Sequence, residues 1–293
     1  MRRLLPRIGL ALGTLLVLLL AYGVLIEPRV ILDEEHAEVA LPQLGDELAG
    51  TEVAVLSDLQ LGMWFANHGM VERAVEATLE ADPDVVLLGG DFVYSSDPTV
   101  QTQIDTLLEL IGPLIDSGIP TYAVLGNHDY KVGAAEELTT ALEDAGIPVL
   151  SNTAVPVPGP VDDPAEQLHV VGIGPDLPNR VDVDAALADV PDTAPRVVLM
   201  HNPTVFDQLP AGTAPLALAG HTHCGQVALP GTPDWAYLAL TSEERIVADG
   251  WAPEGYGAEG NRMFVTCGIG FSVAPIRINA APQVAFFTLQ PEN

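Results

Sequence analysis

Clusters of residues that can bind metal ions follow five separate runs of apolar residues in this chain. The apolar runs are short and continuous, which is typical of strands buried inside a parallel sheet. Each cluster combines aspartate, asparagine, glutamine or histidine with glycines or other residues that favour tight turns. The clusters are residues 57–60, 89–91, 126–129, 200–203 and 220–223. Because the carboxyl ends of parallel strands meet at one edge of a sheet, the pattern predicts an α/β fold with a polar site there.

Strand and helix patterns alternate through the first half of the chain. The predicted strands are residues 52–56, 85–88 and 121–125, and the predicted helices are residues 70–79, 100–115 and 135–145. The second half is richer in strands, which are predicted at residues 168–171, 197–200, 216–219, 263–266 and 284–288, with a short helix at 183–187. Proline, glycine and aspartate are frequent in residues 151–164 and 229–260, which predicts loops.

The five clusters offer carboxylate, amide and imidazole ligands. These hard to borderline donors suit Mn, Fe or Zn rather than Cu(I) or an iron–sulfur cluster. His221 and His223 are alternate residues in a tight turn, so they can point toward two different ions. This arrangement favours a two-metal hydrolytic site, in which a bridging hydroxide attacks and both ions stabilise an in-line displacement.

The order of these motifs resembles that of the calcineurin-like metallophosphoesterase superfamily. The resemblance extends from about Thr51 to the C-terminus, and its most specific parts are Gly-Asn-His-Asp at residues 126–129 and Gly-His-Thr-His at residues 220–223. With Pro-Ile-Arg at residues 275–277 and an apolar N-terminal segment, the chain is similar to the membrane-associated bacterial branch of that superfamily. The resemblance implies a four-layer αββα sandwich with a dimetal site at the top of two packed sheets.

By this resemblance, the clusters are expected to hold two metal ions. One ion would take Asp58, Gln60, Asp91 and His223, and the other would take Asp91, Asn127, His201 and His221, so that Asp91 bridges the ions. His128 matches the histidine of the family that is not a ligand, and it would donate to the phosphoryl oxygen or protonate the leaving group. Asp129 would hold the His128 ring in place; the alternative is a simple turn residue.

Gln60 departs from the pattern, because the family usually has histidine at this position. A carboxamide oxygen is a weaker, neutral donor than an imidazole. Three readings remain open: Gln60 coordinates weakly and favours a harder metal such as Mn, Gln60 stands behind the ligands with water in the gap, or the first metal is lost. We favour a working site, because every other ligand is present.

Residues 8–26 form a run of 19 apolar or small residues without a charge. At about 1.5 Å per residue, a helix of this length spans the hydrocarbon core of a bilayer. Arg2, Arg3 and Arg7 precede it, so the positive-inside rule predicts a single-pass protein of the cytoplasmic membrane with its catalytic domain on the extracytoplasmic side. A cleaved signal peptide, including a degenerate twin-arginine signal, is the alternative. The predicted organisation is an anchor or uncleaved signal at residues 1–27, a linker and first strand at 28–50, and the metallophosphoesterase domain at 51–293.

The chain carries 11 basic and 40 acidic residues, which gives a formal net charge of −29 at pH 7. Such a surface repels phosphate backbones, so nucleic acid is not an expected partner. The expected partners are a phosphorylated small molecule or a lipid-linked phosphate, and the membrane through the N-terminal helix. Anionic headgroups would repel the acidic surface, so the substrate is left open.

Several residues outside the motifs have two readings each. Cys224 and Cys267 would form a disulfide if the domain is exported, although we favour two buried free thiols. Arg277 is expected to clamp a phosphate or to form a structural ion pair. Some aromatic and apolar residues would line the site, contact lipid or simply pack: Met63, Trp64, Phe65, Trp235, Tyr237, Trp251 and Tyr256.

The leading prediction is an enzyme that hydrolyses a phosphate ester or pyrophosphate with metal-activated water, outside the cytoplasmic membrane. The alternative, motivated by Gln60, is a catalytically impaired metal-binding or scaffold protein. A third class is a dimetal hydrolase of non-phosphate esters, since the same ions polarise carbonyl groups.

Overall fold

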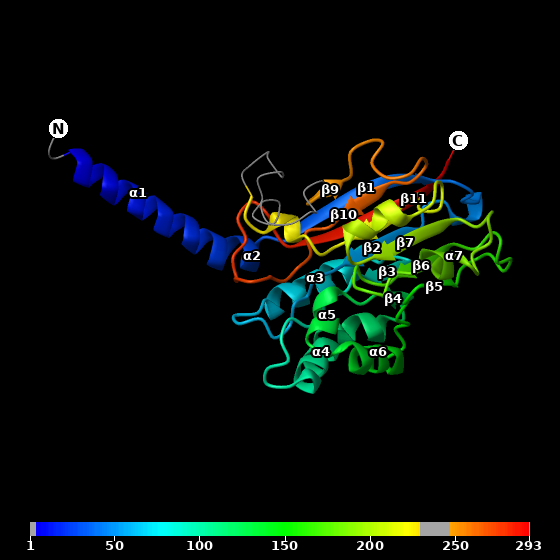
Figure 1. Ribbon diagram of the computed structural model, residues 1–293, viewed down its shortest axis with the longest axis horizontal. Coiled ribbons are helices and arrows are strands. Elements are labelled where there is room, and N and C mark those ends of the chain that lie inside the picture. Colours follow the sequence, from blue (N-terminus) through cyan, green and yellow to red (C-terminus); the bar gives the residue numbers. More distant parts are fainter. Residues whose placement is uncertain (1–3, 229–246, 293) are drawn as a thin grey trace.

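The computed structural model describes residues 4–228 and 247–292, and two packed sheets form its centre (Figure 1). The first sheet consists, in spatial order, of β1 (Asp33–Leu41), β11 (Gln283–Pro291), β2 (Glu52–Leu56), β3 (Val85–Leu88) and β4 (Thr121–Ala123). β1 is parallel to β11, β11 is antiparallel to β2, and β2, β3 and β4 run parallel. The N- and C-terminal parts of the domain therefore meet as neighbouring strands.

The second sheet comes entirely from the second half of the chain. Its strands, in spatial order, are β5 (Thr153–Pro156), β6 (His169–Ile173), β7 (Arg196–Met200), β8 (Ala217–Ala219), β10 (Met263–Val265) and β9 (Gly250–Trp251). The four inner strands are parallel, while β5 and β9 are antiparallel edges. Parallel strands place their carboxyl ends together, which is the geometry that a shared site requires.

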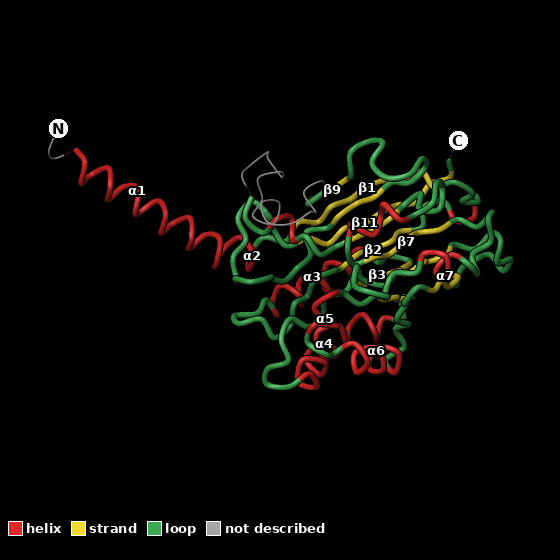
Figure 2. Tube along the Cα trace, viewed as in Figure 1, coloured by secondary structure: helices red, strands yellow, loops and turns green. Residues whose placement is uncertain are grey.

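Helices cover the outer faces of both sheets (Figure 2). Against the first sheet lie α3 (His68–Ala81), α4 (Val100–Ser117) and α6 (Ala135–Asp144), and the short α5 (Asn127–Lys131) follows β4. Against the second sheet lie α7 (Val183–Leu187) and the 3₁₀ helix Pro203–Gln208. The predicted α/β fold with two sheets between helical layers is confirmed, although the layer on the second sheet is thin.

Successive residues of a strand point alternately toward the other sheet and toward the helices, so one strand contributes to the cores on both of its sides. In β2, Val53 and Val55 face the second sheet and pack in one core with Val197 and Leu199 of β7. The intervening Ala54 faces the opposite way, into the core under the helices. Because successive strand residues point to opposite faces, a continuous apolar run is what a strand buried on both sides needs.

α4 shows how local sequence sets a helix. The Thr99 side chain caps its start by accepting a hydrogen bond from Thr102 N at 3.1 Å. Gly118 ends it in the left-handed conformation, with φ 73°. Between these ends, Ile104, Leu107 and neighbouring apolar residues are buried at helical spacing against the first sheet.

The N-terminal segment forms a helix that projects from the domain (Figure 1). α1 (Leu4–Ala21) continues through the π-helical turn Tyr22–Ile26 into α2 (Glu27–Val30). Pro6–Val30, with mean hydropathy 2.4, is the one helix in the described ranges that is long and apolar enough to cross a bilayer. The structure thus supplies a candidate membrane span.

Candidate active site

The five predicted clusters lie together at the carboxyl ends of β2, β3, β4, β7 and β8. Backbone hydrogen bonds tie neighbouring clusters together: Asp58 N donates to Gly90 O at 2.9 Å, and Gly220 N donates to His201 O at 3.1 Å. The clusters are far apart in the sequence, and the order of the parallel strands in the two sheets brings their loops together.

Backbone strain is concentrated in these loops. Five of the seven predicted ligand residues have a positive φ: Asp58, Gln60, Asp91, His221 and His223, at values between 51° and 72°. Residues other than glycine rarely adopt this conformation, and clusters of such residues mark functional sites. This backbone conformation directs several polar side chains into the same site.

Two buried aspartates lie at the centre of the site. Asp91 Oδ2 is 3.3 Å from His201 Nε2, and Asp91 Oδ1 accepts a hydrogen bond from His128 N at 2.8 Å. Asp58 Oδ1 is 3.5 Å from His223 Nε2, and its carboxylate also accepts a hydrogen bond from His221 N at 3.0 Å. Asp91 therefore contacts residues from more than one cluster, as the proposed bridging position requires.

Asp91 and two neighbouring histidines can serve as metal ligands together. Ligand atoms of Asp91, His201 and His221 all lie within 4.8 Å of one another. His201 Nδ1 is 2.8 Å from Gly89 O, a contact that orients the ring so that Nε2 faces Asp91 and His221. Such orienting bonds are typical of metal-binding imidazoles.

Gln60 directly contacts two of the predicted ligand residues. Its side chain is buried, and Nε2 donates to Asp91 Oδ2 at 2.9 Å and lies 3.4 Å from His223 Nε2. Among the described residues, Gln60 Oε1 has no hydrogen-bond partner. A buried carboxamide oxygen without a partner is costly, and a cation would satisfy it.

Asn127 and His128 begin α5, directly beside Asp91. Asn127 Oδ1 lies 3.5 Å from Asn202 Nδ2, so the third and fourth clusters meet there. The His128 ring stacks on Tyr94, with centroids 4.8 Å apart, and its Nδ1 has no hydrogen-bond partner in the described ranges. Tyr94 was not among the predicted site residues, and its position three residues after Asp91 was the available signal.

Asp129 caps α5 instead of bonding to the His128 ring. Its Oδ1 accepts from Val93 N and its Oδ2 accepts from Gly126 N, both at 2.9 Å. Within the described part of the chain, both oxygens of Asp129 are used by backbone groups. The carboxylate therefore fixes the position of the helix that carries His128.

Burial and neighbouring charges shift the pKa values of the central residues. Burial raises the pKa of Asp58 above its usual range. Burial also acts to raise the pKa of Asp91, but the charges of the neighbouring histidines and the hydrogen bond to His201 together outweigh it and hold this pKa below its usual range. Burial acts to lower the pKa of His201, but the charges of Asp91 and Asp58 and the hydrogen bonds to Asp91 and Gly89 together outweigh it and raise this pKa to about 10. A divalent cation fits such a site, because it would supply the positive charge that the carboxylates require.

Arg277 donates to backbone carbonyl oxygens beside the site and forms no ion pair among the described residues, so the expected structural ion pair is not seen there. The side chain is fully buried and donates to the carbonyl oxygens of Gly270, Ala280 and Cys267 at 2.7–2.9 Å. Its Nη2 lies 3.3 Å from His223 Nδ1. Burial and the charge of Arg277 lower the pKa of His223, which keeps this imidazole in the neutral form that binds metals.

The expectation of two free thiols is also wrong, because Cys224 and Cys267 form a disulfide. Cys224 directly follows His223, and Cys267 lies in the loop after β10. The two cysteines are buried and close a stretch with a sequence separation of 43. The bond thus joins the loop of the last predicted ligand cluster to the neighbouring strand end, which is the alternative that the sequence left open for an exported domain.

The aromatic residues outside the motifs divide into packing and exposed groups. Trp251 packs edge-on against Phe264 and Phe287, and Tyr256 stacks on Phe206, so both hold the loop near β9 to the core. Met63 is buried, whereas Trp64 and Phe65 are exposed. Trp235 and Tyr237 lie outside the described residues.

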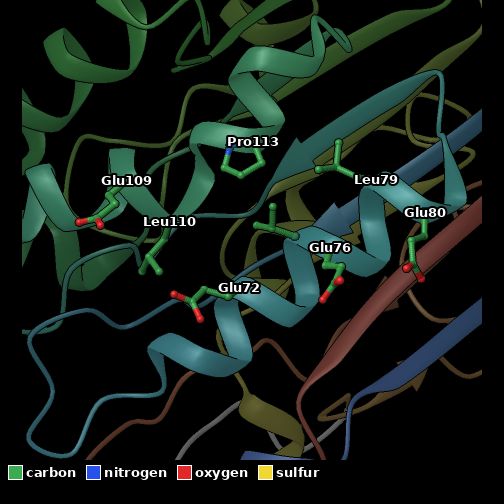
Figure 3. A pocket seen from close by; sticks show the side chains of 8 residues that line it. Glu72, Glu76, Leu79, Glu80, Glu109, Leu110 and Pro113 are labelled. Atoms are coloured by element: carbon green, nitrogen blue, oxygen red, sulfur yellow. The ribbon is translucent and has the colours of Figure 1, made fainter.

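A groove between α3 and α4 is separate from this site (Figure 3). It has a volume of about 640 Å³, and four glutamates stand around an apolar floor. Its lining residues are Glu72, Val75, Glu76, Leu79, Glu80, Glu109, Leu110 and Pro113. Carboxylates of this number repel a phosphate, so the groove is unsuited to a phosphorylated ligand.

Comparisons with known proteins agree with this geometry. The family model described as calcineurin-like phosphoesterase matches residues 51–225. The phosphodiesterase YaeI of Escherichia coli K12 is 31% identical over 253 residues, which cover 83% of this chain and 84% of that protein. A transmembrane protein with a metallophosphoesterase domain from Danio rerio is 27% identical, and the match covers 90% of this chain and 57% of that protein. A solved dimetal phosphatase from Danio rerio has a TM-score of 0.46 at 12% identity, over 78% of this chain and 90% of that one, which is too distant to support an argument.

The site and the family match together define a class of enzyme, the phosphoester hydrolases that use divalent metal ions. This chain belongs to the calcineurin-like phosphoesterase family. The predicted family and the predicted hydrolase activity on phosphoesters are therefore confirmed.

Proposed function

We propose that the chain hydrolyses a phosphate ester or pyrophosphate at a dinuclear site. The observation that carries this proposal is the convergence of seven potential ligand residues, with Asp91 at their centre. The ligands would be Asp58, Gln60, Asp91, Asn127, His201, His221 and His223. When bound, Mn, Fe or Zn ions in this site would supply an activated water and stabilise the charge that develops on the phosphoryl group.

His128 is the proposed donor to the substrate. Its backbone is fixed by Asp91 and its ring by Tyr94, so the imidazole has a defined orientation beside the ligands. From there it would donate a hydrogen bond to a phosphoryl oxygen or a proton to the leaving group. Asp129 would contribute as a positioning residue, because it caps the helix on which His128 sits.

The proposed location is the cytoplasmic membrane, with residues 1–27 as a single-pass anchor and the catalytic domain outside the cytoplasm. Three arginines before the apolar helix and the acidic balance after it support this orientation. The Cys224–Cys267 disulfide supports it independently, because disulfides persist in oxidising compartments. A phosphorylated small molecule or a lipid-linked phosphate would be the substrate.

A second candidate function is a metal-binding or scaffold protein without activity. It is favoured by one observation, the hydrogen bond from Gln60 Nε2 to Asp91, which points an amide N–H at the bridging carboxylate. In that arrangement, Gln60 occupies the space of a ligand without acting as one. The orphaned Oε1 favours the active enzyme, because an exchange of the amide atoms would turn the oxygen toward the ions.

An assay of the full chain in detergent tests the proposal. Chromogenic phosphodiester and monoester substrates are supplied with and without Mn, beside a His128→Ala variant. We expect hydrolysis that requires Mn and falls about 10²-fold or more in the variant. Folded protein without activity on either ester, at saturating Mn, would favour the scaffold function instead.

A further inference from the structure

The exposed apolar side chains of the catalytic domain are confined to one region. Beyond the N-terminal helical segment and the residue that follows it, the exposed large hydrophobic residues in the described ranges are Trp64, Phe65, Val227 and Val273. Trp64 is 66% exposed, Phe65 52% and Val273 63%. They lie in three segments that are far apart in sequence, so chance would scatter them over the surface.

Two of the three segments contact the end of the N-terminal helix. Arg29 in α2 donates to Phe65 O at 2.6 Å and to Ala66 O at 2.8 Å, and its guanidinium lies 4.0 Å from the centre of the Phe65 ring. Arg277 N donates to Gly23 O at 2.9 Å, which attaches the loop that contains Val273. Figure 1 shows the loops before α3 and before β11 on the side of the domain where α1 leaves.

Val227 joins the same region through the loop before β11. Val227 forms a β-bridge with Ile278, and Gln226 Nε2 donates to Ala274 O at 2.9 Å. The four exposed residues therefore lie in segments that are linked, directly or through the loop before β11, to the helix end. We call them the apolar rim: Trp64, Phe65, Val227 and Val273.

Two residues of the apolar rim have an unusual backbone conformation. Phe65 has φ 58° and Val273 has φ 67°, and a positive φ is uncommon for bulky residues and a true outlier for β-branched ones. Strained residues persist where a function requires them, and here the strain presents apolar side chains to the surroundings.

We propose that the apolar rim inserts into the interfacial layer of the membrane that holds the N-terminal helix, and so orients the active site toward the lipid surface. Tryptophan is enriched at this depth. Tyr94 links the rim to the site, since its hydroxyl accepts from Val273 N at 3.2 Å and its ring stacks on His128. This inference rests on the proposed membrane anchor.

Depth-dependent quenching of a fluorophore on the full chain tests the proposal. Both native cysteines are in the disulfide, so a single introduced cysteine takes a maleimide label specifically. The labelled variants are Val273→Cys in the rim, Leu16→Cys in α1, and Glu137→Cys on the exposed face of α6 as the matched control. Each variant is reconstituted into phosphatidylcholine vesicles that contain nitroxide lipids, with the nitroxide either shallow or deep in the acyl region.

We expect the shallow nitroxide to quench the label at position 273 at least threefold more than the label at position 137. The deep nitroxide should quench position 16. Quenching at position 16 without quenching at 273 would overturn the rim contact and leave the anchor intact. No quenching at either position would overturn the anchor, and the rim contact with it.

A double variant tests whether the aromatic residues make the contact. In the Val273→Cys background, Trp64→Ser with Phe65→Ser should reduce the shallow quenching at position 273 by about half or more. Circular dichroism and activity on a soluble ester show whether the variant is folded. Unchanged quenching in folded protein would show that Trp64 and Phe65 do not insert, and would overturn the rim as defined.

Discussion

The catalytic activity of this chain depends on whether Gln60 allows both metal ions to bind. The Gln60 side chain is buried between Asp91 and His223, where an imidazole is usual in the family. For a working site, we predict that Gln60→His keeps the number of bound Mn ions per chain and changes kcat less than about threefold, because the other ligands already define the site. Metal content measured by mass spectrometry after dialysis against Mn checks this.

The wild-type chain is the control for the Gln60 measurement, since both proteins pass through the same dialysis. A rise from one ion per chain in the wild type to two in Gln60→His would contradict the working site. It would show instead that glutamine had removed one metal position.

Tyr94 offers a second test at the scale of one residue. Its ring stacks on His128 and its hydroxyl accepts from Val273 N. We predict that Tyr94→Ala lowers kcat about tenfold, because the imidazole loses its supporting face, whereas Tyr94→Phe keeps the stack and most of the activity. Steady-state kinetics on a soluble phosphodiester separates kcat from KM; equal loss in both variants would mean that the stack is not what positions His128.

A disulfide bond holds together the loops that follow β8 and β10. The Cys224–Cys267 disulfide joins residues with a sequence separation of 43 and lies directly beside His223. For a loop of this length, we predict that replacing both cysteines with alanine costs about 4 kcal/mol of unfolding free energy. Urea unfolding of the full chain, with wild type treated in parallel, measures the difference; a loss below about 1 kcal/mol would contradict the prediction.

The helices and strands differ in how well the sequence predicts their bounds. β2, β3 and α7 have the predicted bounds, because their apolar patterns reflect burial within a few residues. β1 has an acidic sequence and pairs only with β11, some 250 positions later, so its local pattern gives no bounds. The apolar pattern of a strand reports burial, and an edge strand is buried too little to show one.

Within the site, too, some features could be predicted from the sequence and others could not. The ligand clusters could be predicted because strand ends impose a local pattern of glycine and polar residues. The roles of Arg277 and Asp129 could not, since both side chains act on backbone groups that only the folded chain brings to them. The disulfide likewise depends on the tertiary proximity of two loops.

At the scale of the whole molecule, bound metal should stabilise the fold. The proposed ligands follow strands of both sheets, so bound ions would connect loops of the two sheets and offset the repulsion between the buried Asp58 and Asp91 carboxylates. We predict that EDTA lowers Tm by roughly 5–10 °C relative to protein with Mn at about 100 times Kd, and that Mn restores it. Differential scanning fluorimetry in detergent checks this, with Asp91→Asn as the control that should respond much less; identical shifts in both proteins would place the ions elsewhere.

The central claim is that one site around Asp91 holds two metal ions. Crystals of the full chain grown with Mn, and diffraction data collected at the Mn absorption edge, test it directly. We expect two anomalous peaks, one contacting Asp58 and His223 and the other contacting Asn127, His201 and His221, with Asp91 between them. A single peak, or peaks away from these residues, would show that the site does not hold two ions in this way.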